Sequence, residues 1–103
     1  MTPAWLRPRA EADLIDRTAR YRSTGGDELG KRFFDAALAS LRSVERMPGI
    51  GSPVIGETCD IPGLRSCSVK GFTVHWFYFV ADEHLDVVRL LADALDLPAM
   101  LGS

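Results

Sequence analysis

The segment from Phe72 to Val80 constrains the fold more than any other part of this sequence. Its nine residues include five aromatics and no Asp, Glu, Lys or Arg. The run is too short to cross a bilayer as a helix, and aromatic and β-branched residues favour strands. We therefore predict a central β-strand that is apolar on both faces. Alternation places two sets of side chains on opposite faces: Val74, Trp76, Tyr78 and Val80 on one, and Thr73, His75, Phe77 and Phe79 on the other.

Length, charge and cysteine content narrow the class of protein. The 103 residues fit one domain, which we place at 1–103. A net charge of −2 and a pI near 5.6 argue against direct nucleic-acid binding, which usually needs a basic surface. Cys59 and Cys67 are too few for a disulfide framework, and no ligand-spaced cluster predicts a metal or a cofactor. The charged N-terminal stretch has no apolar core of a signal peptide, so we expect a cytoplasmic protein with free thiols and no membrane association.

The N-terminal half predicts one short strand and two helices. Ala4–Leu6 is a brief apolar segment that predicts the strand. Apolar residues then recur at helical spacing through Pro8–Arg22, and Ser23-Thr24-Gly25-Gly26 ends this helix. Asp27 is a suitable N-cap for a second helix that runs to Arg46, where Met47-Pro48-Gly49 stops it. The short connection predicts an antiparallel helical hairpin.

The C-terminal half predicts three strands after a loop. Glycines and prolines are frequent in residues 48–63, so we expect a loop there and not a core element. Strands are predicted at Leu64–Val69, Phe72–Val80 and Leu85–Leu91, and their short turns imply antiparallel pairing. Residues 93–101 predict a short helix or a structured tail. The order is β-α-α-β-β-β, an α+β fold in which a helical hairpin packs on a small, mostly antiparallel sheet.

Several single residues receive structural interpretations. Alternation places Arg89 on the same face of the last strand as Leu85, Val87 and Leu91, so we expect a packed stem and a paired guanidinium. We expect Trp5, Phe33 and Phe34 to lie in the core. His75 is expected at a half-buried position of its strand, and His84 in solvent.

Five segments together carry a resemblance to a known family: Pro8-Arg9-Ala10-Glu11-Ala12-Asp13-Leu14, Met47-Pro48-Gly49-Ile50-Gly51, Gly63-Leu64-Arg65, Asp86-Val87-Val88-Arg89-Leu90-Leu91 and Asp96-Leu97. In order and spacing they resemble the ParE branch of the RelE/ParE toxin superfamily. The resemblance implies the toxin of a type II toxin–antitoxin system, with a ParD-like antitoxin as partner, a hetero-oligomeric complex and DNA gyrase as target. It implies action by binding and not by catalysis.

The ribosome-dependent endoribonucleases of the RelE branch are the enzymatic alternative. Their chemistry needs a proton carrier and cations that stabilise a phosphorane-like transition state. In that branch these groups lie on the sheet and at its C-terminal edge, where this chain has Thr73 and Ala92-Asp93-Ala94-Leu95. Only Arg65, Lys70, Arg89 and His75 remain, and we predict no catalytic residues. A third alternative is a non-toxic module that only binds the antitoxin.

The predicted partner-binding residues are those placed on the uncovered face of the sheet or in the apolar tail. We expect another protein to cover that face, in an interface of over about 1,200 Å². Arg65 would bind an antitoxin carboxylate or would be a solvated or internally paired arginine. The candidates are Arg65, Phe77, Phe79, Arg89, Asp96, Leu97, Met100 and Leu101.

Overall fold

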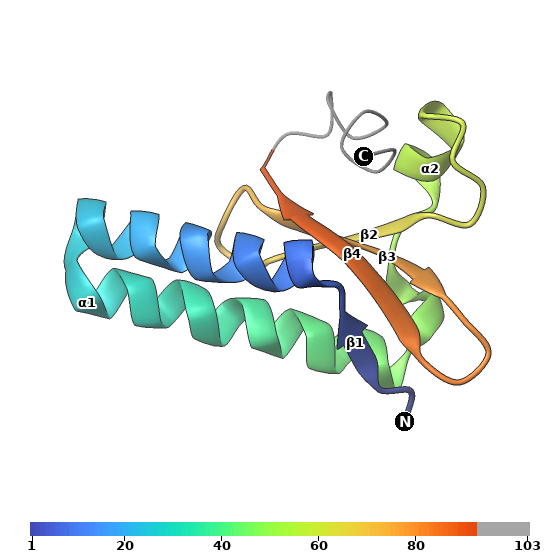
Figure 1. Ribbon diagram of the computed structural model, residues 1–103, viewed down its shortest axis with the longest axis horizontal. Helices are drawn as coiled ribbons and strands as arrows, with labels where there is room; N and C mark the ends of the chain where they lie inside the picture. Colours follow the sequence, from blue (N-terminus) through green and yellow to red (C-terminus); the bar gives the residue numbers. More distant parts are fainter. Residues whose placement is uncertain (93–103) are drawn as a thin grey trace.

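The computed structural model describes residues 1–92 and confirms the predicted α+β class (Figure 1). The tail at 93–103, with the candidates Asp96, Leu97, Met100 and Leu101, lies outside the described residues. Figure 1 shows a hairpin of two helical arms beside a four-stranded sheet. The elements in chain order are β1 (Ala4–Leu6), α1 (Pro8–Arg46), the 3₁₀ turn η1 (Pro48–Ile50), α2 (Val54–Thr58), β2 (Arg65–Ser68), β3 (His75–Val80) and β4 (Leu85–Leu91).

The helical hairpin carries the single label α1 because only one residue interrupts it. Gly26 has φ 85° and ψ 176°, a conformation that a residue with a side chain rarely adopts. We call residues 8–25 the first arm and residues 27–46 the second arm. Pro8 begins the first arm, where a missing N–H leaves no hydrogen bond unmade. The break predicted at residues 23–26 is confirmed, but Gly26 and not Asp27 is the non-helical residue before the second arm.

The strand order is β1-β4-β3-β2, so the aromatic strand β3 lies inside the sheet as predicted. β2, β3 and β4 pair antiparallel, and β1 pairs parallel to β4. Both β2 and β3 are shorter than predicted because residues 69–74 form a turn, with Val69 N–H bonded to Val74 O and Gly71 at φ 86°. Phe72 therefore leaves the strand and packs its ring on Tyr21 and Phe33, at centroid distances of 5.0 and 5.1 Å.

The main core lies between α1 and the sheet and depends on two residues of β3. Trp76 is fully buried, and its indole N–H donates to the Ala37 carbonyl of the second arm at 3.0 Å. Tyr78 is also fully buried; its hydroxyl donates to Pro48 O at 2.8 Å and accepts from Gly51 N at 3.0 Å. Each residue therefore combines a buried ring with a hydrogen bond to another segment.

A bulge in β4 overturns the predicted arrangement of its side chains. Phe77 pairs with Arg89, but the next residue, Tyr78, pairs with Val87, so Val88 has no partner in the register. An extra residue moves every later side chain to the other face of the strand. As a result Leu90 joins the main core, whereas Leu91 joins the opposite side. The expectation that Leu91 shares a face with Leu85 and Val87 was wrong.

Part of the second face of the sheet, around Phe77, is covered by the segment that the sequence analysis assigned to a loop. A second cluster consists of Leu64, Phe77, Val88 and Leu91, with Ile55, Ile61 and Phe79 packed against it. Ile55 lies in α2, so residues 48–63 do contribute to the core. The expectation of an uncovered face is corrected accordingly: Phe77 is 2% exposed, and Phe79 is half-buried.

Trp76→Ala should lower the free energy of unfolding by about 3–5 kcal/mol, because it removes a fully buried ring and leaves a cavity. Trp5→Ala is the matched control, since Trp5 is 60% exposed and should cost less than about 1 kcal/mol. Urea unfolding of both variants measures the difference. A loss below about 1 kcal/mol for Trp76→Ala would show that Trp76 is not part of the core.

Tyr78→Phe should lower the free energy of unfolding by about 1–3 kcal/mol at neutral pH, because Gly51 N–H and Pro48 O lose a buried partner. Burial raises the pKa of Tyr78. The folded state therefore favours the neutral phenol, and this contribution is present below the ordinary tyrosine pKa of about 10 and is lost as the pH rises through the folded pKa.

The stability difference between the wild type and Tyr78→Phe should consequently narrow above about pH 10. Burial also raises the pKa of the Cys67 thiol, with the same sign. A charged Cys67 thiolate acts on Tyr78 in the same direction as burial and also raises the pKa of Tyr78. Urea unfolding at a series of pH values measures the difference, and a constant gap up to pH 11 would contradict this assignment.

Candidate functional site

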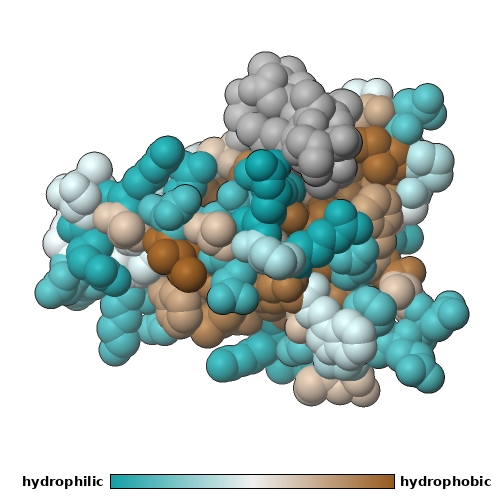
Figure 2. All heavy atoms as spheres, viewed as in Figure 1, coloured by the Kyte–Doolittle hydropathy of each residue, from teal (hydrophilic) through white to brown (hydrophobic). Residues whose placement is uncertain are grey.

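A groove lies on the hairpin, at the end of the arms near Gly26. We call it the hairpin groove. Its volume is about 680 Å³. It is lined by Ile15, Thr18, Ala19, Arg22, Asp27, Lys31 and Phe34. Figure 2 shows hydrophobic atoms reaching the surface along the arms of α1.

Helical geometry explains why apolar side chains remain exposed in this groove. Ala10, Leu14 and Thr18 recur every four residues and face the core, so Ile15 is turned away by about 100°. Ile15 is 60% exposed. On the second arm Phe33 is fully buried, and its neighbour Phe34 is 38% exposed. Phe33 is therefore core as predicted, whereas the core position expected for Phe34 was wrong.

Close approach of the two arms forms the base of the hairpin groove. A Cβ atom added at Gly30 would lie 3.0 Å from Arg22 Cβ and 3.3 Å from Thr18 O. Beside this contact lies Thr18, which is only 8% exposed. Its hydroxyl is buried and has no hydrogen-bond partner. Helical threonines ordinarily bond the carbonyl one turn back. The groove thus combines exposed apolar side chains with one unsatisfied polar group.

Charged residues border the apolar part of the groove. Arg22 and Asp27 form an ion pair at 3.8 Å, and their side chains are 57% and 97% exposed. A pair this exposed contributes little to stability. With Lys31 on the same border, these charges are available to orient a partner.

Arg89 forms the most buried ion pair among the described residues. Its Nε and Nη2 donate to the two carboxylate oxygens of Asp13 at 2.7 and 3.0 Å, and Leu90 N donates to Asp13 Oδ2 at 3.0 Å. The hydrogen bond to Asp13 raises the pKa of Arg89 further. The predicted packed stem and paired guanidinium are confirmed, and the pair joins the first arm to β4.

Arg65 contacts backbone and not a carboxylate. Its Nη1 donates to Gly51 O at 2.7 Å and to Gly49 O at 3.3 Å. The guanidinium therefore connects β2 to the segment around η1. If Arg65 or Arg89 binds a partner, it would do so through the guanidinium N–H groups that do not take part in these hydrogen bonds.

The four side chains considered for RNA cleavage contact different parts of the structure. Arg65 and Arg89 contact the groups just described. Lys70 borders a hollow beside the second arm. The His75 ring lies 6.3 Å from the ring of Phe77, and both belong to the face of the sheet that points away from α1. Within residues 1–92 the structure does not bring these four groups into one cluster.

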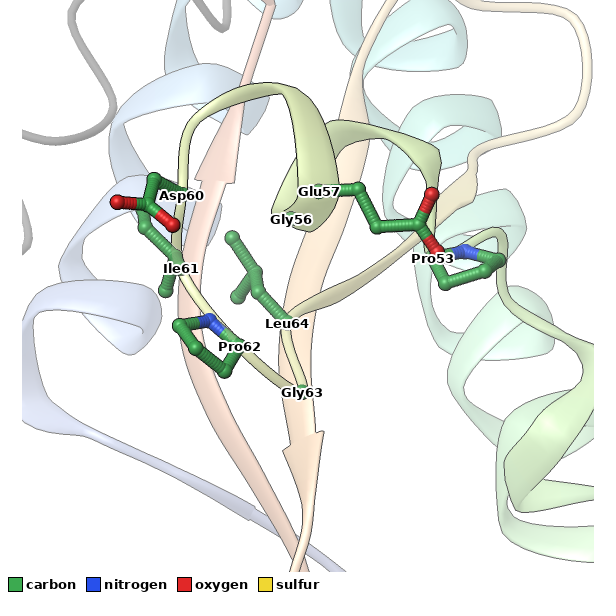
Figure 3. A pocket seen from close by; sticks show the side chains of 8 residues that line it. All are labelled: Pro53, Gly56, Glu57, Asp60, Ile61, Pro62, Gly63 and Leu64. Carbon is green, nitrogen blue, oxygen red and sulfur yellow. The ribbon is translucent and has the colours of Figure 1, made fainter.

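A second hollow, of about 380 Å³, lies beside α2 and holds two carboxylates, those of Glu57 and Asp60. Figure 3 shows that their side chains point to opposite sides. A pair of carboxylates that act as acid and base must flank one substrate, and this arrangement does not provide it. In the described part of the chain, no group of three or more His, Cys, Asp or Glu could bind a metal ion. No helix there is both long and apolar enough to cross a membrane.

Sequence reasoning predicted the antiparallel strands and the pairing of Arg89 but missed the hairpin groove. The signal was present, because Ile15 and Phe34 each lie next to a residue of the core stripe and cannot share its direction. Partner binding by Phe77, Phe79, Arg65 and Arg89 stays a prediction.

The fold is similar to that of a solved structure described as the chromosomal ParDE toxin–antitoxin system from P. aeruginosa. The TM-score is 0.75 at 17% sequence identity, over 88% of this chain and 95% of that one. No family model matches this sequence, and no curated protein matches it. The ParE-like fold expected from the sequence is therefore confirmed by structure.

Asp13→Ala should lower the free energy of unfolding by about 3 kcal/mol, because it leaves the Arg89 guanidinium and Leu90 N–H without an acceptor. The side chains of the pair are only 12% and 17% exposed. Asp86→Ala is the control: it breaks the Arg7–Asp86 pair, whose side chains are 48% and 29% exposed, and should cost at most about 1 kcal/mol. Urea unfolding distinguishes the two. A cost for Asp13→Ala as small as that of the control would contradict a structural role for the pair.

Proposed function

We propose that this chain is the toxin of a type II toxin–antitoxin system and that it acts by binding. The observation that carries the proposal is a ParE-like fold with an open apolar groove on its helical hairpin. The chain's own segments bury Trp76 and Tyr78 on one face of the sheet and Phe77 on the other. The hairpin is thus where exposed apolar surface and an unsatisfied hydroxyl occur together.

The partner is a ParD-like antitoxin that places an amphipathic segment in the hairpin groove. An amphipathic helix typically inserts apolar side chains into such a groove and leaves its charged side exposed. Ile15 and Phe34 offer the apolar contacts, and Arg22, Asp27 and Lys31 offer the charged border. The complex is hetero-oligomeric and cytoplasmic.

The target is DNA gyrase, which the sequence resemblance supports. The tail candidates Asp96, Leu97, Met100 and Leu101 are proposed as part of the contact surface with a partner. A gyrase supercoiling assay with the purified chain tests the target directly. Loss of supercoiling with intact messenger RNA is expected. Cleaved messages with unaffected gyrase would favour the RelE-type alternative, and no effect on either would favour a non-toxic module.

Ile15→Glu and Phe34→Ala should each weaken antitoxin binding at least about tenfold, about 1.4 kcal/mol, because both remove apolar contacts from the groove. The antitoxin is the short reading frame expected immediately upstream of this gene. Met47→Ala is the matched control, since Met47 is 62% exposed and does not line the groove. Titration calorimetry measures the affinities.

Circular dichroism must give the wild-type spectrum for both groove variants, so that a loss of binding is not a loss of fold. Antitoxin affinity that is unchanged in both variants would contradict the hairpin groove as the binding site. The supercoiling assay would then still test the target separately.

A further inference from the structure

Trp5 forms an exposed aromatic surface on the side of the sheet that faces away from α1. Its neighbours Ala4 and Leu6 pack against the main core, so alternation turns Trp5 to the opposite face. The indole is 60% exposed, which corrects the core position expected from the sequence. It stacks on the imidazole of His84 at a centroid distance of 4.0 Å and an angle of 18°. His84 is therefore not simply solvated.

The surroundings of Trp5 are acidic. Asp86 pairs with Trp5 in the register of β1 and β4, and its carboxylate accepts two hydrogen bonds from Arg7 at 2.9 and 2.8 Å. Asp82 and Glu83 are exposed in the turn that ends at His84. Figure 2 shows hydrophilic atoms at the end of the molecule where Figure 1 places the turn between β3 and β4. We call this group the Trp5 patch: Trp5, Arg7, Asp82, Glu83, His84 and Asp86.

The chemistry of the Trp5 patch selects a cation. Tryptophan has the strongest cation–π face among the side chains. Stacking on His84 occupies one face of the Trp5 ring, and the residue is still 60% exposed. With His84 neutral, the patch has three carboxylates and one guanidinium, and that guanidinium is already paired. A nucleotide that stacked on the indole would bring phosphates toward these carboxylates. A side chain with an ammonium or guanidinium group meets attraction from both the ring and the charges.

We propose that the Trp5 patch binds a basic segment of a protein partner, with an arginine or lysine side chain over the open face of the Trp5 indole. Exposed tryptophans in rigid positions are typical of residues that dominate binding energy. The patch lies on the opposite face of the sheet from α1, so this contact is independent of the hairpin groove.

A peptide titration tests the proposal on the full chain. The probe is an acetylated, amidated Gly-Arg-Gly-Arg-Gly peptide, and the readout is the pair of indole N–H signals in ¹⁵N NMR spectra. The Trp5 signal should shift on titration. The Trp76 signal is an internal control, because that N–H is buried and bonded to Ala37 O at 3.0 Å. The corresponding peptide with glutamate in place of arginine should leave both signals unchanged.

Variants separate the ring from the charges. Trp5→Leu keeps apolar bulk and should weaken peptide binding by about threefold to fivefold, a factor typical of an exposed cation–π contact. Trp5→Phe should retain part of the affinity, which shows that the patch is still folded. Glu83→Gln should weaken peptide binding, and the loss of affinity should be larger at low salt than at high salt. Ile15→Glu, in the hairpin groove, should bind the peptide as the wild type does.

Three outcomes would overturn the proposal: no shift of the Trp5 signal, an equal response to the glutamate peptide, or wild-type affinity in Trp5→Leu. The experiment contains neither antitoxin nor gyrase. Its failure therefore leaves the proposed toxin function intact, and the converse also holds.

Discussion

Trp76 and Tyr78 connect the sheet to the segments that pack on it, because each buries a ring and bonds the backbone of a distant segment. Trp76 donates to Ala37 O in the second arm, and Tyr78 bonds Pro48 O and Gly51 N. Any side chain at Gly51 would collide with the Tyr78 hydroxyl. Loss of either hydrogen bond would leave a buried polar group without a partner, which costs about 1–3 kcal/mol. The positions of the hairpin and of η1 relative to β3 therefore depend on these two residues.

This arrangement determines where apolar surface is left. α1 covers one face of the sheet, and the segment around α2 covers the other through Ile55 and Ile61. The aromatic side chains of β3 consequently pack against other segments of the same chain. The exposed apolar side chains of Ile15 and Phe34 lie on the hairpin and not on the sheet. A partner can then bind there without competing with the interactions that keep the domain folded.

Much of the fold could be predicted because its signals are local. Helical period gave α1, Gly26 gave its break, and strand composition gave β3 and β4. The features that were missed depend on tertiary context. The bulge at Val88 is a matter of register between strands, and the burial of Phe77 depends on a short segment whose glycines and prolines suggested a loop. Of the site, the sequence predicted the pairing of Arg89 but not the groove.

Three guanidinium groups bind other parts of the chain, and this bears on the alternative of RNA cleavage. Catalysis of phosphodiester cleavage uses preorganised cations that meet charge as it develops on the phosphate. Here Arg89 is bound to Asp13, Arg7 to Asp86, and Arg65 to the carbonyls of Gly49 and Gly51. Each guanidinium thus stabilises a junction between two elements of the fold, and recruiting it for a substrate would weaken that junction. The hairpin groove has no such conflict, because its lining includes none of these three arginines. Binding of a partner in the hairpin groove, as proposed, would leave the Arg89–Asp13 and Arg7–Asp86 pairs intact.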